Sequence, residues 1–98
     1  MIRHVVMFRW ADDVDAAHVA ATTAEFATLP AAIGQIRSYS YGADLGAVAS
    51  NLDYAVTGEF DSIDDFFAYR DHPAHQALVS TFIASHVVER HAVQFTVS

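Results

Sequence analysis

The first ten residues restrict the fold more than any other segment, because their side chains alternate and both faces are largely apolar. The two sets of alternating side chains are His4, Val6, Phe8 and Trp10 on one face, and Val5, Met7 and Arg9 on the other. This alternation predicts a β-strand, and apolar residues on both faces are typical of a sheet that is covered on both sides. The chain therefore needs a layer over one face of the sheet and a cover for the other.

The rest of the chain divides into two helical regions and three further strands. A first helix is expected from the aspartates at 12–15, which complement the positive end of its dipole, to about Leu29-Pro30. Ser62 is a candidate N-cap for a second helical region, which must break at His72 because Pro73 disfavours the α conformation of the residue before it. The remaining strands are predicted over residues 36–45, 53–60 and 88–97.

The order β-α-β-β-α-β predicts an α+β, ferredoxin-like protomer, with a four-stranded antiparallel sheet and its helices on one face. Val5 and Met7 are expected on the uncovered face, joined by Ala92 and by Tyr39 or Tyr41. Hydrophobic residues make up 53% of the 98-residue chain, which is high for a domain that must keep much of its surface in water. A symmetric partner would cover this surplus, so we predict a homodimer through the open sheet face, that is, a dimeric α/β barrel.

Charge and composition exclude several classes of protein. Five basic residues, all arginine, against twelve acidic ones give a net charge of −7, which argues against nucleic acid and against anionic membrane surfaces as partners. No apolar run is long enough for a transmembrane helix, and the first residues are too short an apolar stretch for a signal peptide. The absence of cysteine excludes disulfides, thiolate nucleophiles and cysteine-ligated metals. We expect one cytoplasmic domain over residues 1–98, with no cofactor.

The densest group of ionisable side chains is the segment Tyr69-Arg70-Asp71-His72-Pro73-Ala74-His75. The break at Pro73 redirects the chain, so that Tyr69 and His75 can converge. The positive end of the following helix should lower the pKa of His75, and a neutral imidazole can accept from a phenol or take a proton from an acidic carbon. His4, on the inward face of the first strand, is expected opposite them. The predicted catalytic residues are therefore Tyr69, His75 and His4.

Simpler interpretations of these residues remain open. His72 and His75 have the spacing of half a metal site, but the proline break spoils their alignment and no third ligand is evident, so we predict no side-chain metal site. Tyr69 could instead be an interfacial aromatic residue, and His4 a half-buried structural histidine. A metal held by backbone carbonyls would leave no signature in the sequence. No role is assigned to three further histidines, His18, His86 and His91.

Three segments resemble the stress-responsive dimeric α/β-barrel (Dabb) family, and the resemblance spans essentially the whole chain. They are His4-Val5-Val6-Met7-Phe8, Gly42-Ala43-Asp44 and Tyr69-x-x-His72-Pro73-Ala74-His75. The resemblance implies a homodimer whose sheets pack face to face. It also implies similarity to the olivetolic acid cyclase-type polyketide cyclases of that family, which close a ring by aldol condensation without a cofactor.

In these cyclases the catalytic tyrosine and histidine match Tyr69 and His75, and a pocket histidine matches His4. The resemblance implies an apolar pocket between sheet and helices that binds a small carbonyl compound. Its expected substrate-binding residues are Val6, Phe8, Phe26, Leu29, His72, Leu78, Val79 and Phe82. Thr22 and Thr23 replace bulky aromatics of the cyclases, and Gln94 replaces an acid, so the same substrate is not implied.

The working hypothesis is cyclase-like chemistry, in which His75 polarises the Tyr69 hydroxyl, Tyr69 deprotonates a carbon between carbonyls, and His4 holds a substrate oxygen. It predicts that Tyr69→Phe abolishes turnover with little loss of stability. The alternative is a non-catalytic ligand-binding or stress-response homodimer, which predicts a similar pocket with Tyr69 and His75 too far apart to hydrogen-bond. A third class, haem or oxygenase chemistry, would require an axial ligand facing a large cavity.

Overall fold

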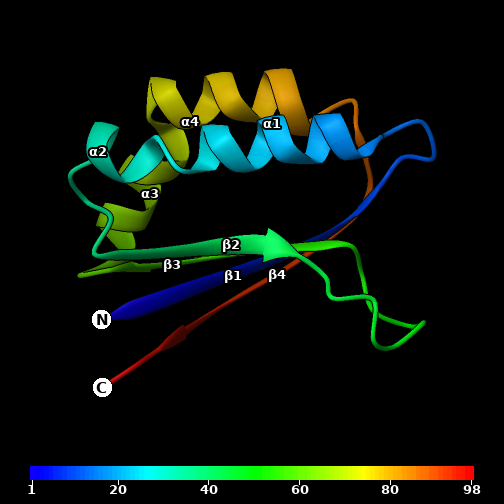
Figure 1. The fold of residues 1–98 in the computed structure, drawn as a ribbon. Helices are drawn as coiled ribbons and strands as arrows, with labels where there is room; N and C mark the ends of the chain where they lie inside the picture. The colour runs from blue at the N-terminus through cyan, green and yellow to red at the C-terminus, as the bar shows by residue number, and fades with distance from the viewer.

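A four-stranded antiparallel sheet forms one layer of the molecule, and all the helices lie over one of its faces (Figure 1). The computed structural model describes all residues 1–98. In chain order the elements are β1 (Ile2–Trp10), α1 (Ala16–Phe26), α2 (Leu29–Ala32), β2 (Ser38–Ala43), β3 (Tyr54–Phe60), α3 (Ile63–Asp71), α4 (Pro73–Leu78), the π-helical turn η1 (Val79–Ile83) and β4 (Val87–Thr96). The strand order β2-β3-β1-β4 confirms the ferredoxin-like arrangement.

The helix boundaries follow from the capping residues and the prolines. Asp15 caps α1 by accepting from the His18 N–H at 2.9 Å, so the preceding aspartates lie before the helix and not in its first turn. The single helix expected up to about Leu29-Pro30 is instead divided into α1 and α2, because Pro30 has no N–H to continue the hydrogen-bond ladder. Ser62 caps α3 as expected, by accepting from the Asp65 N–H at 3.1 Å.

Strand β2 is shorter than expected, because the chain turns after Ala43. Both carboxylate oxygens of Asp44 are engaged, one accepting from the Gly46 N–H at 2.8 Å and the other from the Asn51 amide at 3.0 Å. Gly46 has a φ of 75°, a backbone conformation that glycine adopts without strain. These contacts fold the segment between β2 and β3 into a loop.

The register of the strands corrects the expected composition of the open sheet face. Ala92 pairs with Val6, and Tyr41 pairs with Val56, so their side chains lie on the face covered by the helices. Tyr39, two residues before Tyr41, lies on that face too. The expectation that these three residues lie on the open face is therefore wrong. A one-residue change of register exchanges the two faces of a strand, and only the pairing resolves it.

The open face nevertheless carries an apolar group on the two adjacent strands β1 and β4. Val5 pairs with Val93, and Arg3 pairs with Phe95. Met7, Val93 and Phe95 are 39%, 55% and 44% exposed in the protomer. A second layer over this face would remove them from water.

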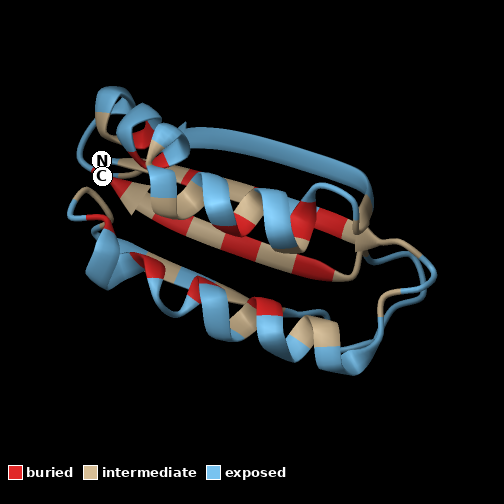
Figure 2. Cartoon of the chain, turned by 90° about the horizontal axis from the view of Figure 1, so that it is seen from above, coloured by how far each residue is buried: buried red, intermediate tan, exposed pale blue.

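The buried residues lie on the strands and on the helices that cover them, where Figure 2 colours the ribbon red. The core consists of twelve residues: Val6, Phe8, Phe26, Leu29, Ile33, Tyr54, Val56, Phe60, Phe66, Tyr69, Leu78 and Ile83. Strand β4 lies at the sheet edge, and most of its residues are exposed. The structure contains no helix with the length and apolar character required to cross a membrane.

Candidate active site

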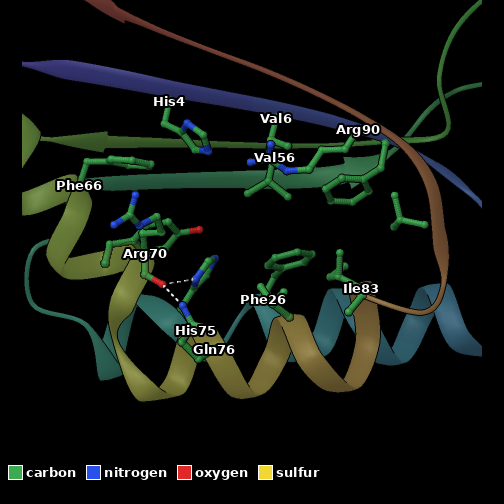
Figure 3. A pocket seen from close by; sticks show the side chains of 15 residues that line it. His4, Val6, Phe26, Val56, Phe66, Arg70, His75, Gln76, Ile83 and Arg90 are labelled. Atoms are coloured by element: carbon green, nitrogen blue, oxygen red, sulfur yellow. Dashed lines mark hydrogen bonds between the residues drawn. The ribbon is translucent and has the colours of Figure 1, made fainter.

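A cavity of about 440 Å³ lies between the sheet and the helices, in the position expected for the pocket. This volume is within the usual range for small-molecule sites. Figure 3 shows the side chains that line it, from β1, β3 and β4 on one side and from α1, α3, α4 and η1 on the other. Seven residues that the sequence placed in the site line this cavity: His4, Val6, Phe8, Phe26, Tyr69, His75 and Val79.

Four other expected pocket residues do not line the cavity. Leu29 and Leu78 are buried in the core. The His72 ring accepts the Ala74 N–H at 3.0 Å through Nδ1 and thereby caps α4. Phe82 packs against the His18 ring, because the π-helical turn η1 shifts the helix face and places Ile83 at the cavity.

Eight further residues line the cavity that were not predicted from the sequence: Val56, Phe66, Arg70, Gln76, Ile83, Ala84, Val87 and Arg90. Arg90 pairs with Phe8 and lies on the helix-facing side of β4, two residues before Ala92. The alternation of the last strand could have identified it, because placing His91 and Val93 on one face puts Arg90 on the other.

His75 is held by the carbonyl oxygen of Arg70, at the end of α3. Its Nδ1 lies 2.9 Å from this oxygen, which also accepts from the Gln76 amide at 2.8 Å (Figure 3). A carbonyl oxygen can only accept, so Nδ1 carries the proton and Nε2 of the neutral ring is a free acceptor. Burial lowers the pKa of His75, and the charge of Arg90 lowers it further. The pKa of His75 is thus shifted in the expected direction, and burial is the main cause.

His4 has the opposite arrangement of ring nitrogens. It is 5% exposed, and its Nδ1 lies 2.8 Å from the Gln94 Nε2, which can only donate. The neutral His4 ring therefore carries its proton on Nε2. Burial, together with the charges of Arg90 and His75, lowers its pKa to about 4. At neutral pH the cavity thus holds two uncharged imidazoles, one accepting through Nε2 and the other donating.

Tyr69 and His75 converge, but they are not hydrogen-bonded. Their ring centroids lie 4.4 Å apart, while the Tyr69 hydroxyl lies 2.7 Å from the hydroxyl of Tyr39. The expectation that His75 orients this hydroxyl is therefore wrong. Tyr39 approaches because its strand partner is Gly58, where a Cβ would lie only 3.3 Å from the Tyr39 ring.

The hydroxyl pair also bears on the role expected for Tyr69 as a base. Burial raises the pKa of Tyr69 and that of Tyr39. Both phenols are therefore protonated at neutral pH and act as hydrogen-bond donors or acceptors. The missing Tyr69–His75 hydrogen bond is the geometry that the non-catalytic hypothesis predicts.

The spacing of His72 and His75 would suit half of a metal site, but the His72 Nδ1 accepts from the Ala74 N–H and the His75 Nδ1 donates to the Arg70 carbonyl oxygen. No cluster of three or more histidine, aspartate or glutamate side chains is arranged to hold a metal ion.

Comparison with known proteins identifies the family to which this chain and its fold belong. The chain belongs to the stress responsive A/B barrel domain family, whose sequence profile matches residues 2–97. An uncharacterised protein of Streptomyces coelicolor is 33% identical over 82 residues, covering 82% of this chain and 84% of the relative. A dimeric ferredoxin-like protein of unknown function from Thermobifida fusca is 44% identical, with a TM-score of 0.91 over 98% of this chain and 90% of its own.

The hydroxynitrile lyase of Passiflora edulis has the same fold. Its TM-score is 0.85 at 18% identity, over 99% of this chain and 93% of the lyase. The fold is thus shared by an enzyme and by dimeric proteins whose function is unknown.

Proposed function

We propose that the cavity catalyses acid–base chemistry on a small carbonyl compound, and specifically a polyketide cyclase-like aldol ring closure that needs no cofactor. The observation that carries this proposal is the fixed tautomer of His75, whose Nδ1 donates to the Arg70 carbonyl oxygen and whose Nε2 is left to accept a proton. Its lowered pKa keeps this nitrogen unprotonated at neutral pH.

In the proposed reaction, His75 Nε2 removes a proton from a carbon between two carbonyl groups. The electron pair moves onto a carbonyl oxygen, and the resulting enolate accepts a hydrogen bond from His4 Nε2–H. The enolate carbon then attacks another carbonyl of the same molecule, forming a carbon–carbon bond, and the new alkoxide takes the proton back from His75. His75 thus replaces Tyr69 as the proposed base, because the Tyr69 phenol stays protonated.

The Tyr69–Tyr39 pair supplies a second donor in this proposal. When Tyr39 donates to Tyr69, the Tyr69 hydroxyl proton is free to bond a substrate oxygen. The surrounding walls are mostly hydrophobic, which strengthens each hydrogen bond and limits hydrolysis of a reactive poly-carbonyl chain. A lyase with the same fold supports a catalytic role for such a pocket.

Exchange of a carbon-bound hydrogen for solvent deuterium tests this proposal without knowledge of the natural substrate. Ethyl 2-benzyl-3-oxobutanoate carries a single hydrogen between two carbonyls, and NMR in D₂O follows its loss. We expect the protein to accelerate this exchange by about 100-fold or more over buffer, and His75→Gln to abolish the acceleration. Binding of the probe without acceleration would contradict the proposal.

The second candidate function is a non-catalytic ligand-binding or stress-response protein. It is favoured by one observation, the pairing of the Tyr69 hydroxyl with Tyr39 and not with His75. This candidate predicts that the probe binds, that buffer alone accounts for the exchange rate, and that His75→Gln leaves the rate unchanged.

We further propose that two copies of the chain pair through their open sheet faces. The exposed apolar side chains of Met7, Val93 and Phe95 lie on this face, and the Thermobifida fusca relative is described as dimeric. Light scattering should give twice the protomer mass for the native chain. Val93→Glu should give the single mass, whereas Ala77→Glu, an exposed substitution on α4, should leave the dimer intact.

A further inference from the structure

We infer that the ligand of this cavity is an apolar compound that carries a carboxylate, and that Arg90 binds this carboxylate. This inference deepens the proposed function, because it names the class of substrate that the same cavity would take. It rests on the pairing of the arginines, on the composition of the cavity wall and on the position of Arg90.

Arg90 is the one arginine of the five without a carboxylate partner in the protomer. The other four form ion pairs: Arg3 with Glu59, Arg9 with Glu89, Arg37 with Asp61 and Arg70 with Asp71. Twelve acidic residues are present in the chain, yet none of them neutralises Arg90. The guanidinium is therefore available for an anion from outside the chain.

The cavity wall contains no aspartate or glutamate. Arg70 also lines the cavity, but its charge is paired with Asp71, to which its Nε and one terminal nitrogen donate. The two histidines of the wall are uncharged at neutral pH because burial lowers the pKa of each. A chain with a net charge of −7 thus has a pocket whose only uncompensated charge is positive.

Arg90 extends from β4 into the cavity, where its side chain lies by Val6 and Val56 (Figure 3). Its charge also lowers the pKa of His4 and that of His75, after burial as the main cause in each. A carboxylate can accept two parallel hydrogen bonds from a guanidinium, which fixes both its position and its orientation. The apolar remainder of the ligand would then pack against Phe8 and Val56, with a carbonyl group near His75.

A pair of probes that differ only in charge tests this inference by calorimetry at pH 7. The probes are 4-phenylbutanoate and 4-phenylbutanamide, neither of which has a hydrogen between two carbonyls. We expect the native protein to bind the acid at least about tenfold more tightly than the amide. Arg90→Gln should remove this preference, Arg90→Lys should keep part of it, and the matched control Arg37→Gln should keep all of it.

Equal affinity for the two probes, no binding of either at millimolar concentration, or a preference for the acid that survives in Arg90→Gln would overturn the inference. The result is separable from the proposed reaction, because binding of these probes requires no proton transfer. A preference for the acid without deuterium exchange would contradict the chemistry and support the anion site. Deuterium exchange without a preference for the acid would support the proposed chemistry and contradict the anion site.

Discussion

The Nδ1 of His75 lies 2.9 Å from the carbonyl oxygen of Arg70, across the break that Pro73 makes between α3 and α4. An uninterrupted helix would use this carbonyl in its own hydrogen-bond ladder. The break leaves the oxygen free for the His75 ring and for the Gln76 amide. A helix interruption thus fixes the tautomer of the histidine on which the proposed reaction depends.

The first prediction concerns the tautomers of the two cavity histidines. Nitrogen-15 NMR of the labelled protein at pH 7.5 should show His75 protonated at Nδ1 and His4 protonated at Nε2, because their partners are a carbonyl oxygen and an amide N–H respectively. Gln94→Leu should remove the preference of His4 for the Nε2-protonated tautomer and leave the tautomer of His75 unchanged. The same tautomer in both residues would contradict the account.

The second prediction concerns Tyr69→Phe. This change removes the hydrogen bond to Tyr39, so the free energy of unfolding should fall by about 1 kcal/mol in urea titrations. Deuterium exchange should slow less than in His75→Gln, because Tyr69 serves as a donor and not as the base. Tyr39→Phe is the matched control for stability. Complete loss of exchange in Tyr69→Phe alone would restore Tyr69 as the base.

Much of this site was predictable from the sequence, because its signals are local. The alternation of β1 placed His4, Val6 and Phe8 on the helix side, and Pro73 marked the break that brings Tyr69 and His75 together. Local signals of this kind also predicted the element order, which the structure confirms.

The predictions that are wrong concern positions that depend on strand pairing or on helix geometry. The register of β2 places Tyr39 by Tyr69, and no local pattern reports that register. The π-helical turn exchanges Phe82 for Ile83 at the cavity, because the spacing expected for an α-helix no longer applies.

The third prediction concerns stability against pH. The pKa of His4 falls from 6.5 to about 4 on folding, chiefly through burial. Between these values the unfolded chain binds the extra proton, so stability is full above pH 6.5 and falls as the pH drops toward 4. By about pH 4, His4 alone should have lowered the free energy of unfolding by roughly 3 kcal/mol. Urea unfolding at several pH values should show a smaller loss in His4→Gln than in the native chain, whereas parallel curves would contradict the prediction.

The fourth prediction concerns the charge of Arg90. After burial, this charge contributes to the lowered pKa of both His4 and His75. Arg90→Gln should therefore raise the pKa of both residues in NMR titrations, while leaving both below the ordinary value because burial persists. The control Arg37→Gln removes an equal charge on the surface and should shift neither pKa.

The central claim is that His75 acts as the base, and the pH dependence of deuterium exchange tests it most directly. With ethyl 2-benzyl-3-oxobutanoate as the probe, the protein-dependent rate should follow the unprotonated form of His75. It should therefore hold constant at neutral pH and fall with a midpoint below 6.5, since burial lowers this pKa. His75→Gln should remove the protein-dependent rate at every pH. An unchanged rate in His75→Gln, or a rate that rises only in the alkaline range of a phenol, would contradict the account.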